Sequence, residues 1–202
     1  MGEGIVFLVD DDKPVLHGMK RLCESVGHEV RTFSDAESFL EAYRGEAGCL
    51  ILDVRMPGMG GLALQDRLIA GGHDIPIVFI TGHGDVPMAS KTLRKGALDF
   101  LEKPFRENIL LERIEQGLAS DQKRRSLVAH ADELRSHLAK LTDREGQVMR
   151  LLVDGRTVKE IGLELELSHK TVHVHRAKIL EKTGARTVVD LTRIALRARS
   201  ET

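Results

Sequence analysis

The sequence predicts an α/β protein in which a doubly wound parallel sheet is followed by a linker helix and a small all-helical domain. Short apolar runs alternate with amphipathic stretches over the first 120 residues, residues 121–141 are charged, and residues 142–202 carry only helix signals. Alternating strand and helix signals are typical of a parallel sheet with helices on both faces. We therefore expect domains at 1–120 and 142–202, joined by a linker helix at 121–141.

Five strands and five helices are expected in the first domain. The run GCLILDV has the length and composition of a buried strand. Glycines 27, 71, 72 and 96 lie where helices should stop, because glycine ends many helices. The expected strands are 4–9, 29–33, 48–54, 76–81 and 98–102, and the expected helices are 13–27, 36–44, 61–71, 86–95 and 107–120.

An apolar repeat runs along the expected linker helix. Leu127, Ala131, Leu134, Leu138 and Leu141 recur at alternating intervals of four and three. The repeat covers two heptads, fewer than the three or four that indicate a coiled coil. Two interpretations stay open: the helix packs on its own domain, or it forms a seam between two copies of the chain.

Capping signals divide residues 142–202 into four helices. A serine or threonine accepts hydrogen bonds from the free amides of a first helical turn, and an acidic residue three positions later completes a capping box. The signals are helix starts at Thr142 and Ser168, boxes at Thr157–Glu160 and Thr187–Asp190, and helix ends at Gly155 and Gly184.

The formal charge differs between the two parts of the chain. Residues 1–120 hold 13 Lys+Arg and 19 Asp+Glu, a net charge of −6, whereas residues 121–202 hold 17 and 12, a net charge of +5. This asymmetry favours a cation or effector site in the first part and a polyanionic partner for the second. Random surface variation is the alternative.

Composition also limits the class of protein. Cys23 and Cys49 have no His or second Cys at metal spacing, which predicts a reducing compartment without disulfides or zinc. No apolar stretch approaches the roughly 18 residues that span a bilayer, and no signal-peptide pattern opens the chain. The scarcity of aromatic residues argues against a base-stacking RNA platform. We expect a soluble cytoplasmic protein without a membrane partner.

Carboxylates follow or close two of the expected strands. Asp10 and Asp11 follow the first strand and Asp53 closes the third, and the carboxyl ends of parallel strands share one edge of a sheet. Two such charges about 4 Å apart repel by about 4 kcal/mol at an effective dielectric constant of about 20. A hard divalent cation offsets this repulsion, and oxygen ligands suit Mg²⁺. Asp12 is better explained as the N-cap of the next helix.

A hydroxyl group and an amine complete the expected site. Thr81 ends the fourth strand and Lys103 follows the fifth. A phosphoryl group on Asp53 would bring charge that Lys103 can neutralise, while Thr81 can donate a hydrogen bond to a phosphoryl oxygen. Each residue alone has an ordinary structural explanation. Their joint occurrence at four strand ends favours a phosphate-accepting Asp53.

Four segments carry a resemblance to a known family. VFLVDDDKPV, LILDVRMPGMGG, ITGHGDVPMA and LDFLEKPF resemble the receiver domain of bacterial two-component response regulators, in particular the FixJ-like subgroup, over the first 120 residues. The resemblance implies a five-stranded sheet of order 2-1-3-4-5 and phosphotransfer from a sensor histidine kinase to Asp53. It also implies that Asp10, Asp11 and Asp53 hold Mg²⁺, with Arg55 contributing only its backbone carbonyl.

The same resemblance implies two features near the fifth strand. The family places a switch aromatic at the position of Phe100, which would rotate into space left by Thr81 when phosphate draws the threonine away. An ordinary core phenylalanine is the alternative. Lys103–Pro104 is similar to the family's usual cis-proline turn.

The expected helix at 169–184 has one basic face. Residues 169–186 hold five Lys or Arg and a single acid, while Val172, Ile179 and Leu180 form the expected buried side. Such a helix, after a second helix and a short turn, is the helix-turn-helix arrangement. Its first turns would enter the major groove of DNA while lysines and arginines contact phosphates. A solvated charged face is the alternative.

The strings LTDREGQVMRLL, VKEIG and SHKTVHVHRAKILEKTGA are similar to the LuxR/NarL-type DNA-binding domain, over about residues 141–198. His173 departs from the lysine or glutamate frequent at its position, so the operator sequence is not implied. His169, His173 and His175 imitate a metal cluster, but their spacing places His173 and His175 on different sides of the helix. The candidate contacts with double-stranded promoter DNA are Lys170, Thr171, His173, Val174, Arg176, Lys178 and Lys182.

The leading hypothesis is a response regulator that is not an enzyme. Phosphorylation of Asp53 would control homodimerisation and sequence-specific DNA binding, and hence transcription by RNA polymerase. Candidate dimer contacts are Lys91, Lys95 and Asp99.

Two rival functions stay open. An aspartyl-phosphate hydrolase of the haloacid dehalogenase type is one, because Asp10-x-Asp12 imitates its opening motif. Pro14 stands where that motif has Thr or Val, and Asp53 would have no role. The other rival is a receiver that acts as a phosphate-independent docking module.

Overall fold

Five parallel strands form the sheet of the amino-terminal part, in the order β2-β1-β3-β4-β5. This is the predicted order. Val6 of β1 pairs with Val30 of β2 on one side and with Cys49 of β3 on the other, and both pairings are parallel. The strands are β1 (Ile5–Val9), β2 (Glu29–Phe33), β3 (Gly48–Asp53), β4 (Ile77–Thr81) and β5 (Asp99–Glu102), each within one residue of its expected bounds.

The computed structural model describes residues 4–82 and 93–199 of the chain. It divides into two units, Met1–Arg125 and Ser126–Thr202. The predicted helix at 86–95 lies mostly outside the described residues.

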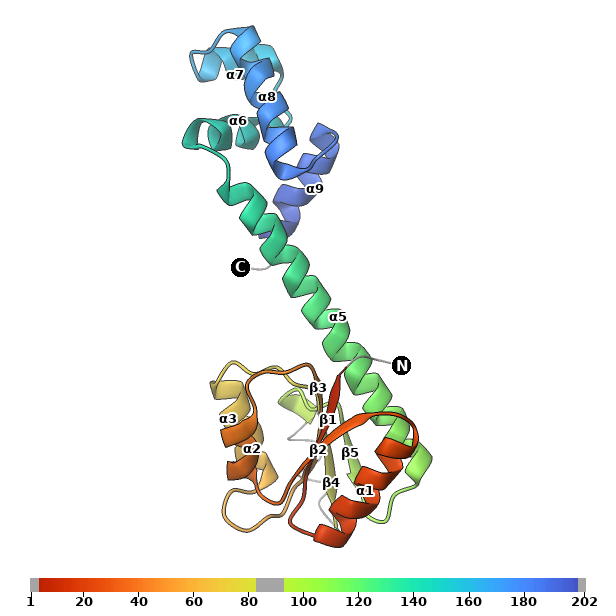
Figure 1. Cartoon of the computed structure of the whole chain (residues 1–202). Coiled ribbons are helices and arrows are strands. Elements are labelled where there is room, and N and C mark those ends of the chain that lie inside the picture. The colour runs from red at the N-terminus through yellow and green to blue at the C-terminus, as the bar shows by residue number, and fades with distance from the viewer. Residues whose placement is uncertain (1–3, 83–92, 200–202) are drawn as a thin grey trace. The chain divides into compact units, whose positions relative to one another are not determined.

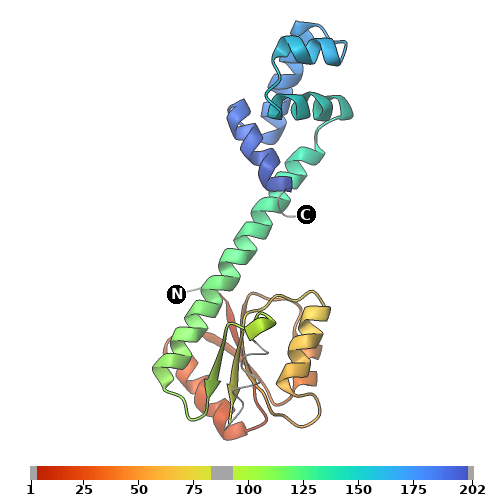
Figure 2. The ribbon, with the colours of Figure 1, turned by 180° about the vertical axis from the view of Figure 1, so that it is seen from behind.

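Helices cover both faces of the sheet, as predicted. α2 (Ala36–Ala42) and α3 (Gly61–Ala70) lie on one face, and α1 (Lys13–Ser25) and the first part of α5 (Glu107–Ala139) lie on the other (Figure 1 and, from behind, Figure 2). Successive strand side chains point to opposite faces, so each strand contributes to two cores. One core holds Phe7, Leu50, Leu52 and Phe79 with Phe39 and Leu64, and the other holds Val6, Leu8, Ile51 and Ile80 with Leu16 and Ile114.

The helix ends near the sheet follow the predicted capping signals. The Asp12 carboxylate accepts a hydrogen bond from the Val15 amide at 3.2 Å and so caps α1. Gly60 precedes α3 and supplies no side-chain cap.

α5 is a single uninterrupted helix of 33 residues. It spans the predicted boundary at residue 120 without a break. Its Gly117 lies against β3, where a side chain does not fit: a Cβ atom there would be 2.4 Å from Cys49 Sγ. The sulfur of Cys49 is fully buried, so the close approach of helix and strand requires glycine.

Four helices make up the rest of the carboxy-terminal unit. Their core contains Val148, Leu152, Ile161, Val172, Ile179 and Leu191, and capping boxes form at Thr142–Glu145 and Thr157–Glu160. Gly184 ends α8 in the left-handed conformation, as predicted. The helices are α6 (Asp143–Val153), α7 (Val158–Glu164), α8 (His169–Thr183) and α9 (Val188–Arg199). Within 4–82 and 93–199 no helix has the length and hydropathy needed to cross a membrane.

The apolar repeat of the linker is only partly exposed. Ala131 is buried, and Leu141 packs against the carboxy-terminal core, so this part of the repeat serves the chain's own domain. Leu127 and the neighbouring Val128 stay 55% and 50% exposed. Both interpretations of the repeat, packing on its own domain and a seam between two copies, therefore stay open.

An ion pair joins α6 to the end of α8. The Glu145 carboxylate, 5% exposed, accepts hydrogen bonds from Lys182 Nζ at 2.6 Å and from the Thr142 amide at 2.9 Å. These two bonds, that from Lys182 first, lower the pKa of Glu145 to about 2 from an ordinary value of 4.5. The pair thus holds together the two helices that flank the domain core.

We expect Gly117→Ala to destabilise the amino-terminal unit by roughly 1–3 kcal/mol, because the added methyl overpacks the contact with Cys49. Helix propensity alone predicts the opposite sign, a gain of about 1 kcal/mol. Urea unfolding measures the change. The matched control is Gly146→Ala in α6, where nothing lies within 4 Å of an added Cβ and stability should rise. Equal effects of both substitutions would contradict the packing explanation.

We expect Glu145→Gln to destabilise the carboxy-terminal unit at neutral pH by roughly 1–2 kcal/mol. The pKa of Glu145 in the folded chain is about 2, below the ordinary 4.5. The ionised carboxylate therefore contributes fully to the free energy of unfolding above pH 4.5, and this contribution is lost as pH falls toward 2. Urea titrations followed on methyl NMR signals of Val148 and Ile161 should therefore converge for the two chains at low pH. Glu181→Gln, an exposed carboxylate beside Lys182, is the control and should change little. A pH-independent difference would refute the role of the charge.

Candidate functional site

Groups from four strand ends meet at one edge of the sheet. Lys103 Nζ donates hydrogen bonds to Asp10 Oδ2 at 2.6 Å and to Asp53 Oδ1 at 2.7 Å. The Lys103 amide donates to the Thr81 carbonyl at 2.6 Å, which places the end of β4 beside the lysine. The structure thus brings together four of the five residues that the sequence predicts at this edge, namely Asp10, Asp53, Thr81 and Lys103.

Asp53 is held in a fixed orientation at the end of β3. Its side chain is 7% exposed, and each carboxylate oxygen already accepts one hydrogen bond. Oδ1 faces Lys103, while Oδ2 accepts from the Arg55 amide at 2.7 Å. A carboxylate fixed in this way can act as an oxygen nucleophile toward an electrophile that enters at the exposed edge.

Asp10 is the more deeply buried carboxylate of the pair. Its side chain is 1% exposed, and Oδ1 accepts a hydrogen bond from the Asp12 amide at 2.9 Å. Burial raises the pKa of Asp10, against the lowering effect of the bonds from Lys103 and Asp12. A further positive charge beside Asp10 would therefore stabilise its ionised form.

Lys103 carries a charge that its neighbours stabilise. Burial disfavours the ammonium, but the hydrogen bonds to Asp10 and Asp53 outweigh burial and raise the pKa of Lys103. Lys103 precedes Pro104 across a cis peptide bond, which confirms the expected cis-proline turn.

The donor set at this edge fits a hard divalent cation. Asp10 and Asp53 present oxygen atoms within reach of one shared cationic group, and the burial of Asp10 favours a second cation. The described part of the chain has no cluster of three or more His, Cys, Asp or Glu side chains arranged around a metal position. Mg²⁺ needs no such cluster, because it retains several water ligands.

The side chains of Asp11, Thr81 and Phe100 differ in exposure. Asp11 is exposed, Thr81 is buried, and Phe100 is half-buried against the core on the α2–α3 face. The backbone amide of Arg55 donates a hydrogen bond to Asp53, and the predicted role of its carbonyl stays a prediction.

The predicted dimer contacts have partners within the chain. Lys95 pairs with Asp66 of α3, and Asp99 pairs with Arg113 of α5. Lys91 lies outside the described residues. The structure therefore leaves the role of these residues in dimerisation as a prediction.

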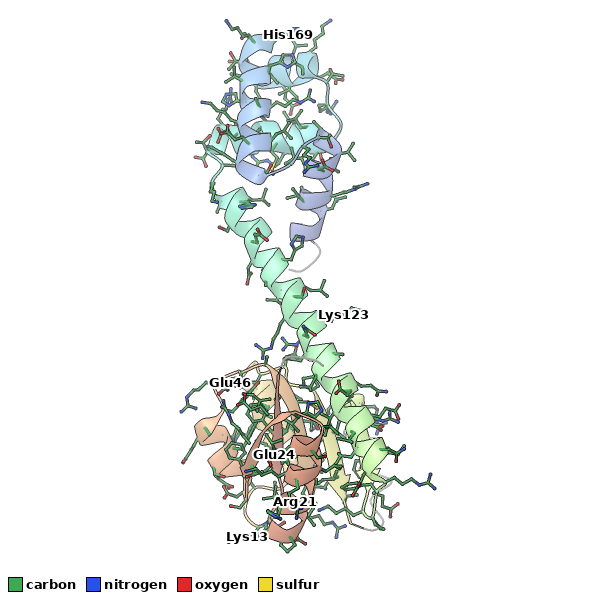
Figure 3. All side chains as sticks on the ribbon, turned by 45° about the vertical axis from the view of Figure 1, so that its right-hand side comes forward. Lys13, Arg21, Glu24, Glu46, Lys123 and His169 are labelled. Carbon is green, nitrogen blue, oxygen red and sulfur yellow. The ribbon has the colours of Figure 1, made fainter. Side chains whose placement is uncertain are left out.

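The exposed face of α8 contains four of the seven predicted DNA contacts. Lys170, His173, Val174 and Lys178 are exposed and recur at the spacing of one helix face, opposite the buried Val172 and Ile179. Figure 3 labels His169, the first residue of α8. Ala177 lies on the same face but was not predicted, since an alanine gives no signal for binding.

The other three predicted contacts are engaged or half-buried. Thr171 is half-buried, and its hydroxyl and amide both bond to Ser168 Oγ, at 2.7 and 3.1 Å. Arg176 is half-buried on the packing side, and Lys182 is paired with Glu145. Their roles at DNA remain predictions, and for Lys182 the structure gives a structural role as well. His175 is half-buried, whereas His173 is exposed, in agreement with their predicted positions on different sides of the helix.

Family models match both parts of the chain. Residues 6–115 match the response regulator receiver domain, and residues 139–195 match the LuxR family of bacterial regulatory proteins. The chain is 42% identical to the response regulator protein TmoT of Ectopseudomonas mendocina over 196 residues, 96% of this chain and 89% of the relative. It is 38% identical to the transcriptional regulatory protein FixJ of Bradyrhizobium diazoefficiens, over 97% and 96% of the two chains.

Solved structures agree with these matches. The response regulator StyR has a TM-score of 0.90 and 45% identity, covering 96% of this chain and 98% of the other. Full-length FixJ from B. japonicum has a TM-score of 0.60 and 36% identity, with 98% of both chains covered. The sheet edge and the basic α8 have a common explanation: the chain belongs to the two-component response regulators, with a receiver domain and a DNA-binding LuxR-type helix-turn-helix domain that regulates transcription.

Proposed function

We propose that phosphorylation of Asp53 by a sensor histidine kinase controls homodimerisation and sequence-specific promoter binding by this regulator. The observation that carries the proposal is the ammonium of Lys103, which contacts both Asp10 and Asp53. A cation held between two carboxylates supplies the charge that a third anionic group, a phosphoryl on Asp53, needs.

The proposed reaction is transfer of a phosphoryl group from a phosphohistidine of the kinase. A carboxylate oxygen of Asp53 forms the new P–O bond while the P–N bond to the imidazole breaks, and the released imidazole takes up a proton. Lys103 neutralises charge on the phosphoryl oxygens, and the bond from the Arg55 amide keeps the carboxylate aligned. The product is an acyl phosphate on the chain.

Mg²⁺ is the proposed cofactor at this edge. Asp10 and Asp53, with the backbone carbonyl of Arg55, would hold the ion once the exposed Asp11 turns toward it, and the ion would supply charge stabilisation to the phosphoryl oxygens. Burial raises the pKa of Asp10, and a cation beside it would favour its ionised form.

Thr81 and Phe100 are the proposed switch residues. Thr81 is buried at the end of β4, one strand from Asp53, where its hydroxyl can turn toward a phosphoryl oxygen. Phe100 pairs with Phe79 in the neighbouring strand and is half-buried, and it would rotate into the space that Thr81 leaves. A population change from 1:99 to 99:1 would require about 5.5 kcal/mol of differential stability.

The exposed face of α8 is the proposed reading surface. Lys170 and His173 lie in its first turns, the part of a recognition helix that reaches base edges, and Lys178 lies one to two turns later, suited to a phosphate contact. One such domain holds a short half-site, and joining two raises affinity through effective concentration. RNA polymerase is the further partner, and the cytoplasm is the proposed compartment.

The rival functions are less well supported. The relatives that cover the whole chain are response regulators, not hydrolases, so an aspartyl-phosphate hydrolase has no support from them. A phosphate-independent docking module would leave the shared contact of Lys103 with Asp10 and Asp53 without a function.

We expect Asp53→Asn to abolish phosphorylation-dependent dimerisation and the accompanying gain in operator affinity, which for allosteric coupling is roughly 5- to 150-fold. Basal non-specific DNA binding should stay unchanged. Light scattering and DNA titration, each with and without beryllofluoride and Mg²⁺, measure both effects. Glu41→Gln, at an exposed carboxylate of α2, is the control and should behave like the parent chain. Dimerisation that persists in Asp53→Asn would reject Asp53 as the acceptor.

We expect Lys178→Ala and His173→Ala to change DNA binding in two different ways. Loss of a phosphate contact at Lys178 should weaken binding to all sequences and lower the salt slope, −dlogK/dlog[salt], by about one. Loss of a base contact at His173 should cost roughly 1–3 kcal/mol on the operator only. Fluorescence titrations on operator and random duplexes at several salt concentrations separate the two. Identical behaviour of both variants would contradict the proposed docking of α8.

A further inference from the structure

A polar cluster ties α5 to the start of the phosphoacceptor strand. Asp121 of α5 is 1% exposed, although a carboxylate is rarely buried without partners. Its Oδ2 accepts a hydrogen bond from the Gly48 amide at 3.0 Å, a contact between residues 73 positions apart. We call the group the α5 clasp, and its members are Asp121, Arg124 and Arg125 of α5 with Gly45, Glu46 and Gly48.

The two arginines complete the clasp. Arg125 Nε donates to Asp121 Oδ2 at 2.6 Å, and its Nη2 donates to the carbonyls of Gly45 and Glu46 at 2.8 and 2.9 Å. Arg124 donates to Asp121 Oδ1. Both oxygens of the buried carboxylate are therefore satisfied by charged donors or a backbone amide. Figure 3 labels Glu46, in the loop before β3, and Lys123, which directly precedes Arg124 and Arg125 in α5.

The clasp begins where the apolar packing of α5 ends. Leu110, Ile114 and Leu118 anchor the first part of the helix in the receiver core, and Leu118 is the last of these buried residues. The next turn is held by the clasp, and the first unit ends at Arg125. Leu127 and Val128 then follow and are exposed. The apolar contacts already hold the first part of α5 against the receiver core. The clasp therefore holds the following turn, after which α5 continues as the linker.

The clasp and the phosphate site occupy opposite ends of one strand. Gly48 begins β3 and Asp53 ends it, and every residue between them is buried. The start of the strand is tightly packed, since a Cβ on Gly48 would lie 2.2 Å from the Ile5 carbonyl oxygen. Tightly packed elements move as units and do not deform gradually, so a shift of β3 at Asp53 is expected to reach Gly48.

We infer that Asp121 and Arg125 are positioning residues that couple β3 to the linker part of α5, so that phosphorylation of Asp53 governs the carboxy-terminal domain. The inference rests on the proposed function, because it needs a phosphorylation-dependent change in DNA binding to transmit. The alternative role is purely structural, in which the clasp stabilises the receiver and has no part in regulation.

The test compares two clasp variants with two controls in the full-length chain. Asp121→Asn removes the charge that holds both arginines, and Arg125→Ala removes the bonds to the Gly45 and Glu46 carbonyls. Asp132→Asn and Arg135→Ala are the controls, because Asp132 and Arg135 form an exposed ion pair further along α5. Each chain is assayed for phosphorylation of Asp53 by acetyl phosphate, for dimerisation, and for binding to a duplex selected from a random pool by the phosphorylated parent chain.

We expect the clasp variants to accept phosphate and dimerise like the parent chain, while their phosphorylation-dependent gain in DNA affinity falls roughly five-fold or more. Unphosphorylated DNA binding should stay unchanged, and the controls should keep the full gain. Amide hydrogen exchange at residues 119–126 should be faster in Arg125→Ala, which verifies that the clasp is open.

The outcomes separate the inference from the proposed function. A full gain in Arg125→Ala with an opened clasp would overturn the inference. Loss of phosphorylation and stability together in both clasp variants would assign the clasp a structural role only, and also overturn it. If Asp121→Asn alone does not fold, Arg125→Ala decides, with Arg125→Lys expected to restore part of the gain. A parent chain without any phosphorylation-dependent gain would refute the proposed function itself.

Discussion

The contact of Lys103 with two buried carboxylates is the interaction on which the receiver site depends. Asp10 and Asp53 come from neighbouring strands, and without a cation between them their charges would repel at close range. Lys103 enters this position from the turn after β5, two strands away from β3. The arrangement therefore requires the whole parallel sheet, with its strand ends at one edge, to be formed.

That arrangement leaves the site with charge still to be compensated. Burial raises the pKa of Asp10 even in contact with Lys103, so one ammonium does not fully offset the desolvation of this carboxylate. The proposed divalent cation would relieve this imbalance, and the proposed phosphoryl group on Asp53 would then return negative charge to the site. The receiver is thus electrostatically suited to alternate between two charge states, as a switch requires.

The carboxy-terminal domain uses charge in two separate ways. On α8, Lys170 and Lys178 are exposed and available to a polyanion, whereas Lys182 on the same helix is bound to Glu145 and holds α6 in place. The α5 clasp shows the same structural use, with Arg124 and Arg125 bound to the buried Asp121. Among these five residues, Lys170 and Lys178 are exposed and are the proposed partner contacts, whereas Lys182, Arg124 and Arg125 hold helices in place.

The sequence by itself determined the elements, the sheet edge and the identity of the central residues. Strand bounds were predicted to within one residue, because apolar runs and capping side chains are local signals. Asp10, Asp53, Thr81 and Lys103 were predicted to converge, because parallel strands align their carboxyl ends. Only the tertiary structure decided the contacts that no local pattern encodes: the requirement for Gly117 opposite Cys49, the pairing of Lys182 with Glu145, and the contact of Asp121 with Gly48. Each of these depends on the distance between atoms far apart in the chain, and packing sets that distance.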